Sequence, residues 1–208
     1  METVGVTPYR IAAVTFTNKA AREMRERLST LMGPRSRELT ASTFHAFCAM
    51  VLRREGKHIG LDRNFSIYDD SDQMAAVKRA MDDVGFDLAP RGVLTAISSA
   101  KSQLSDADSY GARSDTPFEK MVHRVYERYD QLLWQSSALD FDDMLFKTYF
   151  LFDQFPEVAT KYQNRFTHLM VDEFQDTNIA QYAIAKQLAT NHRNLCVVGD
   201  PDQSIYSW

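Results

Sequence analysis

Short apolar runs that end abruptly in polar turns constrain most strongly how this chain can fold. Four such runs indicate buried strands, at residues 11–16, 39–43, 168–171 and 195–198. Three of them lead directly into the turn sequences TNK, DEFQD and GDPDQ. Parallel strands covered on both faces have this apolar character, and open α/β sheets bind their ligands where the strands end. The pattern predicts an α/β fold with a parallel sheet and polar groups at one edge.

Between the second and third runs the sequence has the periodicity of helices. Apolar residues recur at helical spacing from Met74 to Val84 and from Met121 to Leu133, and Thr116 to Glu119 has the form of a capping box. Similar stripes predict helices near residues 20–31, 44–52 and after 139. We therefore expect one α/β domain, made of residues 1–55 and 139–208, with an all-helical domain inserted at 56–138.

The overall charge argues against a simple basic nucleic-acid-binding module. The 208 residues carry a formal net charge of −4, whereas such modules are strongly positive. The charge is uneven, because residues 19–37 hold six basic and two acidic residues and residues 139–176 hold eight acidic and three basic ones. This split allows a phosphate-binding surface and an acidic metal site, although charge alone favours ordinary solvated helix faces.

The cysteines and the hydropathy pattern favour the cytoplasm. Cys48 and Cys196 each lie inside an apolar run, so we expect both to be small, reduced core residues. No apolar run approaches the roughly 20 residues of a membrane span, and the first ten residues, METVGVTPYR, have no signal-peptide pattern.

The most informative segment places two carboxylates directly after the third apolar run. Asp172 and Glu173 follow the sequence HLMV and should reach the ligand-binding edge of the sheet. In phosphoryl transfer, one such carboxylate holds Mg²⁺, usually through water, and the other orients the attacking water. We assign Asp172 to Mg²⁺ and Glu173 to the water. The alternative is that Asp172 caps the next helix and Glu173 is merely solvated.

The last apolar run leads into a tight Gly-Asp-Pro-Asp turn followed by Gln203. A neutral amide can both donate and accept hydrogen bonds, so Gln203 suits a sensor of a γ-phosphate. Tyr206 and Trp208 follow with aromatic faces on which bases of single-stranded DNA can stack. The alternative for both rings is a place in the core.

Both segments resemble conserved motifs of superfamily 1 DNA helicases of the UvrD/PcrA/Rep type. VDEFQDTN at 171–178 is similar to their motif II, and VGDPDQSIYSW at 198–208 to their motif III. Residues 13–28 and 40–56 look like motifs Ia and Ib. Residues 64–73 and 137–145 are also family-like, so the resemblance runs over essentially the whole chain.

The resemblance implies a RecA-like first motor domain that uses ATP and Mg²⁺, with Asp172, Glu173 and Gln203 in the ATP site. Its partners would be single-stranded DNA, junctions of single- and double-stranded DNA, and repair or replication proteins in the bacterial cytoplasm. The residues that it implies for single-stranded DNA are Phe16, Asn18, Lys19, Thr43, Phe44, His45, Phe141, Tyr206 and Trp208.

The chain departs from the family in its phosphate-binding residues. The P-loop, G-x-x-x-x-G-K-[ST], is absent from these 208 residues, where Gly-Lys occurs only at 56–57. We expect that the P-loop, a first strand and a second motor domain lie outside this chain, and that the chain alone is inactive. Two alternatives are a non-catalytic module for single-stranded DNA or protein interaction, and a Mg²⁺-dependent nuclease using Asp172, Glu173 and Asp176.

Overall fold

The computed structural model describes residues 5–203, and these belong to two compact units. The sheet unit comprises the chain up to Val51 and from Tyr149 onward, and the helical unit comprises Leu52–Thr148. Along the chain, the boundaries between the units fall within helices α2 (Phe44–Glu55) and α7 (Phe141–Gln154). The domain boundaries expected from the sequence, 55/56 and 138/139, lie at the end of α2 and just before the start of α7, and they remain a prediction.

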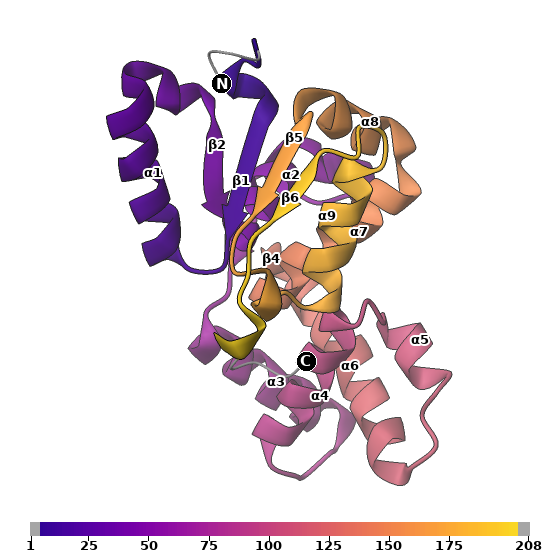
Figure 1. The fold of residues 1–208 in the computed structure, drawn as a ribbon. Helices are drawn as coiled ribbons and strands as arrows, with labels where there is room; N and C mark the ends of the chain where they lie inside the picture. The colour runs from indigo at the N-terminus through magenta and orange to yellow at the C-terminus, as the bar shows by residue number, and fades with distance from the viewer. Residues whose placement is uncertain (1–4, 204–208) are drawn as a thin grey trace. The chain divides into compact units, whose positions relative to one another are not determined.

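The sheet unit contains a parallel four-stranded sheet, so the predicted α/β fold class is confirmed. Its strands are β1 (Ile11–Thr15), β2 (Thr40–Thr43), β5 (His168–Val171) and β6 (Leu195–Val197), in the order β2-β1-β5-β6 (Figure 1). All three pairings are parallel. Each strand matches a predicted apolar run to within one residue at either end. Strand β1 is buried along its whole length, as expected for a central strand covered on both faces.

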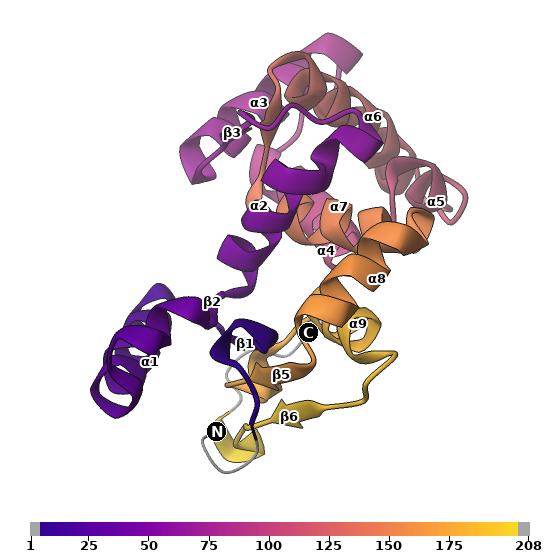
Figure 2. The same cartoon turned by 90° about the horizontal axis from the view of Figure 1, so that it is seen from above.

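Helices flank this sheet, and local sequence signals set where the first of them begins and ends. Helix α1 (Asn18–Met32) packs against β1 and β2. The Thr17 side chain caps its start, and Gly33, at a φ of 60°, ends it. Helix α9 (Ile179–Ala189) packs against β5 and α8 (Pro156–Arg165), and Figure 2 shows α8 beside α9. Short 3₁₀ turns lie at Pro8–Arg10, Gly33–Glu38, Phe174–Asp176 and Pro201–Gln203.

Strand β6 corrects one expectation about the core. Within residues 5–203, β6 pairs with β5 and with no other strand, so it is the edge strand of the described sheet. Cys196 is therefore exposed rather than buried, and the neighbouring Val197 and Val198 are 44% and 60% exposed. Cys48 is buried, as expected.

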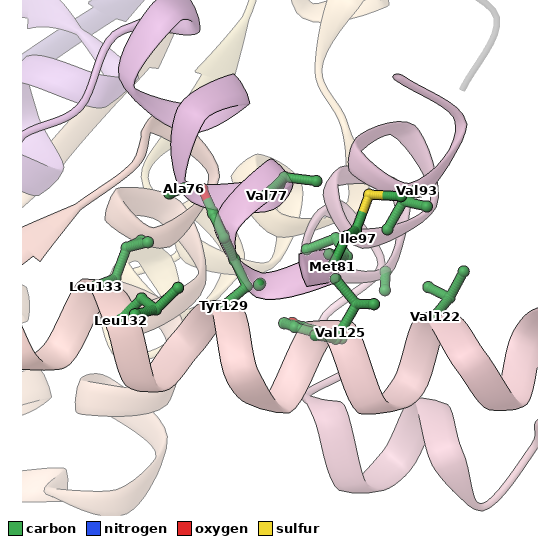
Figure 3. Close-up of a cluster of buried hydrophobic side chains, with 13 residues drawn as sticks. Ala76, Val77, Met81, Val93, Ile97, Val122, Val125, Tyr129, Leu132 and Leu133 are labelled. Carbon is green, nitrogen blue, oxygen red and sulfur yellow. The ribbon is translucent and has the colours of Figure 1, made fainter. Parts of the chain in front are cut away.

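The helical unit is built around a cluster of apolar side chains from three helices. These are α3 (Asp70–Val84), α4 (Pro90–Ser102) and α6 (Pro117–Gln135), and Figure 3 shows their side chains meeting. The predicted capping box at Thr116 and Glu119 is present. Two further elements are the short helix α5 (Ala107–Gly111) and the 3₁₀ turn Gly56–Ile59.

The expectation that residues 56–138 form only helices was wrong in one respect. A two-residue strand, β3 (Ser66–Ile67), pairs in parallel with β4 (Ala138–Leu139). Both strands are too short to show a two-residue alternation in the sequence. Among the described helices, none is both long and apolar enough to cross a bilayer.

Candidate functional site

The parallel sheet brings four polar segments to one edge. Because all four strands run the same way, their carboxyl ends share that edge, and the strand order fixes the order of the segments. The residues that follow β2 and β1 include Thr43–His45 and Phe16–Lys19. The residues that follow β5 and β6 include Asp172–Glu173 and Gly199–Gln203. The predicted DNA-contacting and ATP-site residues of this unit thus occupy adjoining halves of one edge.

The backbone holds Asp172 in place, and neither Asp172 nor Glu173 caps a helix through its side chain. The amide of Asp172 donates to the carbonyl of Val14 at 2.9 Å, which continues the β1–β5 pairing by one step. Glu173 has left-handed backbone angles, φ 54° and ψ 43°, an uncommon conformation for a residue with a side chain. The cap of α9 is Asn178, which forms a reciprocal capping box with Gln181. The alternative that Asp172 caps this helix was therefore wrong.

A chain of hydrogen bonds joins the acidic pair to the turn that carries Gln203. The amide of Gln175 donates to the Glu173 carboxylate at 2.7 Å. The side-chain oxygen of Gln175 accepts from the backbone N–H of Asp200 at 3.1 Å. Gln203 in turn donates through its side chain to the Asp200 carboxylate at 2.7 Å. Gln175, which sequence reasoning left without a role, thus connects the two segments.

Gly199 allows this connection because it leaves room for Gln175. A β-carbon at position 199 would lie 2.6 Å from the side-chain oxygen of Gln175 and 3.2 Å from the backbone nitrogens of Phe174 and Gln175. These separations are shorter than van der Waals contact. Backbone also joins the two segments, since the amide of Phe174 donates to the carbonyl of Val198 at 2.9 Å.

On the other half of the edge, the predicted DNA-contacting residues differ in how accessible they are. Asn18 and Lys19 are exposed at the start of α1, and Phe16 is half-buried. Thr43 is 6% exposed, and its hydroxyl accepts from the amide of Ala46, which caps α2. Phe44 is 3% exposed. A base contact by Phe44 would therefore require this ring to leave the core.

The remaining predicted DNA-contacting residues occupy different parts of the chain. His45 is half-buried, and burial lowers the pKa of its imidazole, which keeps the ring neutral at neutral pH. Phe141 belongs to the helical unit, begins α7 and is 44% exposed. Tyr206 and Trp208 lie outside the described residues.

One buried hydroxyl at this edge was not predicted from the sequence. Thr15 lies beside Asp172 in the register that pairs Val14 with Val171. It is fully buried, and its Oγ1 has no hydrogen-bond partner within residues 5–203. A buried polar group without a partner is rare and often belongs to a functional site. A lone threonine at a strand end gives no sequence signal of this kind.

The acidic segment does not form the converging cluster that a nuclease would use. Asp176 is only 8% exposed within its 3₁₀ turn. Among the described residues, the group of His, Cys, Asp or Glu with ligand atoms within 4.8 Å of one another is Asp108, His123 and Glu127, in the helical unit. The three-carboxylate alternative with Asp172, Glu173 and Asp176 therefore has no geometric support here.

Comparison with known proteins decides the family. Residues 1–208 match the UvrD/REP helicase N-terminal domain. The chain belongs to this family. The geometry agrees, because the parallel sheet and its carboxyl edge are those expected of a RecA-like motor domain.

Several curated relatives cover nearly all of the chain. It is 47% identical over 208 residues to an ATP-dependent DNA helicase PcrA of Bacillus subtilis, covering 98% of this chain. It is 46% identical over 207 residues to the protein of that name in Staphylococcus aureus, and 45% identical over 212 residues to that of Leuconostoc citreum. The chain spans 28% of the length of each of these relatives.

We predict that Gly199→Ala breaks the link between the two segments. The added methyl group would displace the Gln175 side chain and break its hydrogen bond with the Asp200 amide, at an expected cost of about 1–3 kcal/mol. Hydrogen exchange of the Asp200 amide measures the effect, which should be faster by at least tenfold. Gly92→Ala is the matched control, because a β-carbon there meets nothing within 4 Å. Unchanged protection of Asp200 in Gly199→Ala would contradict the predicted displacement.

Proposed function

We propose that this chain is part of the first motor domain of an ATP-dependent DNA helicase, which couples ATP hydrolysis to movement along single-stranded DNA. The observation that carries the proposal is the division of one sheet edge. Carboxylates and Gln203 follow β5 and β6, whereas Phe16, Asn18 and Lys19 follow β1. Because β1 pairs directly with β5, a change at the acidic half would need to cross only one strand spacing to reach the other half.

The relatives support the same assignment, since those described above are named ATP-dependent DNA helicase. We propose that the complete activity belongs to a longer protein and that the isolated chain hydrolyses no ATP, because it carries no P-loop. The proposed setting is the cytoplasm of a bacterium. The proposed partners are single-stranded DNA, its junctions with duplex DNA, and repair or replication proteins.

The side chains at the acidic half have the chemistry that Mg²⁺ and a nucleotide require. Asp172 supplies the hard oxygen ligand that Mg²⁺ prefers, and the buried hydroxyl of Thr15 is a second oxygen beside it. Mg²⁺, when bound, would neutralise negative charge on the phosphates. We assign Asp172 to holding this ion, directly or through water. Glu173 accepts the proton and orients the attacking water.

Gln203 would report the state of the phosphates through its turn. Its amide donates to Asp200, whose own N–H is bonded to Gln175, and Gln175 donates to Glu173. A side-chain rotation at Gln203 would release the Asp200 carboxylate, and a resulting shift of the Asp200 backbone would change how Gln175 bonds the carboxylate that orients water. Neutral amides suit this role because they exchange partners without a change of charge.

The other half of the edge would hold single-stranded DNA. Phe16 offers an aromatic ring for base stacking, while Asn18 and Lys19 lie exposed for the backbone phosphates. Neutral His45 would line the same path. Thr43 and Phe44 are buried, so we propose that Thr43 supports this path from below and that Phe44 reaches a base only when its ring leaves the core. We also propose DNA contacts for Phe141, Tyr206 and Trp208.

We predict that Glu173→Gln in the full-length protein abolishes turnover without abolishing DNA binding. Loss of the group that accepts the proton should lower kcat of the DNA-stimulated ATPase by about 100-fold or more. Affinity for an oligo-dT should change less than twofold. Steady-state phosphate release and fluorescence anisotropy measure the two quantities. Glu157→Gln, at an exposed site on α8, is the control. ATPase activity of Glu173→Gln near wild type would refute the assignment.

Phe16→Ala should weaken oligo-dT binding by the isolated chain. Loss of one stacked base costs about 1–3 kcal/mol, which corresponds to roughly 5–150-fold in affinity. A fluorescence titration at low salt measures it, and the binding should weaken further as salt is added. Tyr9→Ala is the matched control, because Tyr9 is 51% exposed but lies before β1 begins. Equal losses in the two variants would exclude a specific platform at Phe16.

The direction of movement follows from the resemblance and is open to a direct test. We propose 3′-to-5′ translocation. The full-length protein should unwind a duplex with a 3′ single-stranded tail at least tenfold faster than one with a 5′ tail. A strand-displacement assay with the two tailed duplexes and a blunt control measures this ratio. Faster unwinding of the 5′-tailed duplex would reverse the assigned polarity.

A further inference from the structure

The helical unit contains a buried cation surrounded by carboxylates. Lys101, on α4, is 1% exposed. Its Nζ lies 2.8 Å from Asp143, 3.0 Å from Asp140 and 3.4 Å from Asp130. Burial alone would lower the pKa of this amine, but the carboxylates of Asp140, Asp143 and Asp130 raise it well above its ordinary value. Lys101 is therefore charged throughout the physiological range.

Two of these carboxylates also start helix α7. The Oδ1 atom of Asp140 accepts from the amide of Asp143 at 2.6 Å, and Asp143 accepts in return from the amide of Asp140 at 3.5 Å. This reciprocal pattern is a capping box built from two aspartates. Asp140 also accepts from the hydroxyl of Tyr129 at 2.8 Å. Lys101 thus neutralises two like charges that would otherwise repel each other at the start of the helix.

A second contact from α4 holds the residue on the other side of Phe141. Ser98 donates to the Asp142 carboxylate at 2.6 Å. Ser98 and Lys101 are three residues apart, so they share one face of α4. Residues 140, 142 and 143 are therefore fixed by α4, and Phe141 among them is 44% exposed.

Stability alone does not account for such an arrangement. Buried ion pairs often contribute no more to stability than apolar side chains of similar volume, because desolvation offsets their attraction. What they do specify is a geometry, since each carboxylate must meet its donor. Here the specified geometry is that of the backbone on both sides of an exposed aromatic ring.

We propose that Lys101 is a positioning residue for single-stranded DNA, because its ion pairs with Asp140 and Asp143 fix the start of α7 and so the presentation of Phe141. The inference rests on the proposed function, in which Phe141 contacts a base. Lys101 itself touches no DNA. It acts through the backbone of residues 140–143. Tight binding of single-stranded DNA would therefore require that the helical unit is folded.

Lys101→Met in the full-length protein tests the proposal, with 2-aminopurine placed at successive positions of a tailed duplex. The fluorescence of 2-aminopurine changes when the base stacks. The DNA position at which this change is lost in Phe141→Ala serves as the reporter. We expect Lys101→Met to lose the same signal and about five- to tenfold in DNA affinity. Combined with Phe141→Ala, it should cause no further loss of the fluorescence signal or of DNA affinity.

Two further variants separate positioning from loss of fold. Val93→Ala removes a fully buried side chain from the same helix α4 without touching the charged cluster. It should lower the melting temperature but keep the reporter signal. If Lys101→Met does not fold, the triple variant Lys101→Met, Asp140→Asn, Asp143→Asn replaces it, because asparagine retains the capping hydrogen bonds without the charges.

The possible outcomes are distinct. Suppose that Phe141→Ala is defective but that Lys101→Met or the triple variant folds and keeps the wild-type reporter signal and DNA affinity. This result would overturn the positioning role of Lys101 and leave the DNA contact of Phe141 in place. A loss of the signal in Val93→Ala equal to that in Lys101→Met would also overturn it. Wild-type affinity in Phe141→Ala would remove the DNA contact of Phe141 from the proposed function, and the inference with it.

Discussion

The pairing of β1 with β5 is the constraint on which the rest of the sheet unit depends. Val14 lies opposite Val171, and the next amide, that of Asp172, donates to the carbonyl of Val14. This register places the end of one strand beside the end of the other. A shift by a single residue would turn every side chain to the opposite face and would separate the acidic pair from the segment that begins with Phe16. Both strands are nearly all apolar, so core burial and site geometry are specified together.

At the start of α7 in the helical unit, the local backbone is fixed in a different way. There, charged groups rather than apolar side chains specify a local backbone, with Lys101 at the centre. Apolar packing tolerates exchanges of similar volume, whereas a buried carboxylate must meet its donor. In each unit, the apolar core should therefore tolerate substitutions of similar volume, whereas the residues that fix a local backbone should not. In both, these residues adjoin an element to which we assign a function.

The sheet was predictable because its strands are short apolar runs with polar ends, a pattern that depends only on neighbouring residues. The acidic pair and Gln203 were proposed from the same kind of pattern, and their roles remain predictions. The burial of Phe44 was harder to predict, because an aromatic ring can either pack in the core or stack on a DNA base. Cys196 was placed wrongly because the exposure of β6 depends on its neighbours in the sheet and not on its own sequence. Gln175 and Lys101 act through contacts over 25 and 39 residues respectively, which no local pattern reveals.

The left-handed backbone of Glu173 places conflicting demands on that position. Residues with a side chain are disfavoured there by about 1–2 kcal/mol, and glycine or asparagine would relieve the strain. Selection for thermal stability alone should therefore enrich glycine or asparagine at 173, and selection for the catalytic role that we propose for Glu173 should retain glutamate. Selection for stability and selection for turnover would then favour different residues at position 173. A thermostable variant that keeps Glu173 would need stabilising substitutions at other positions.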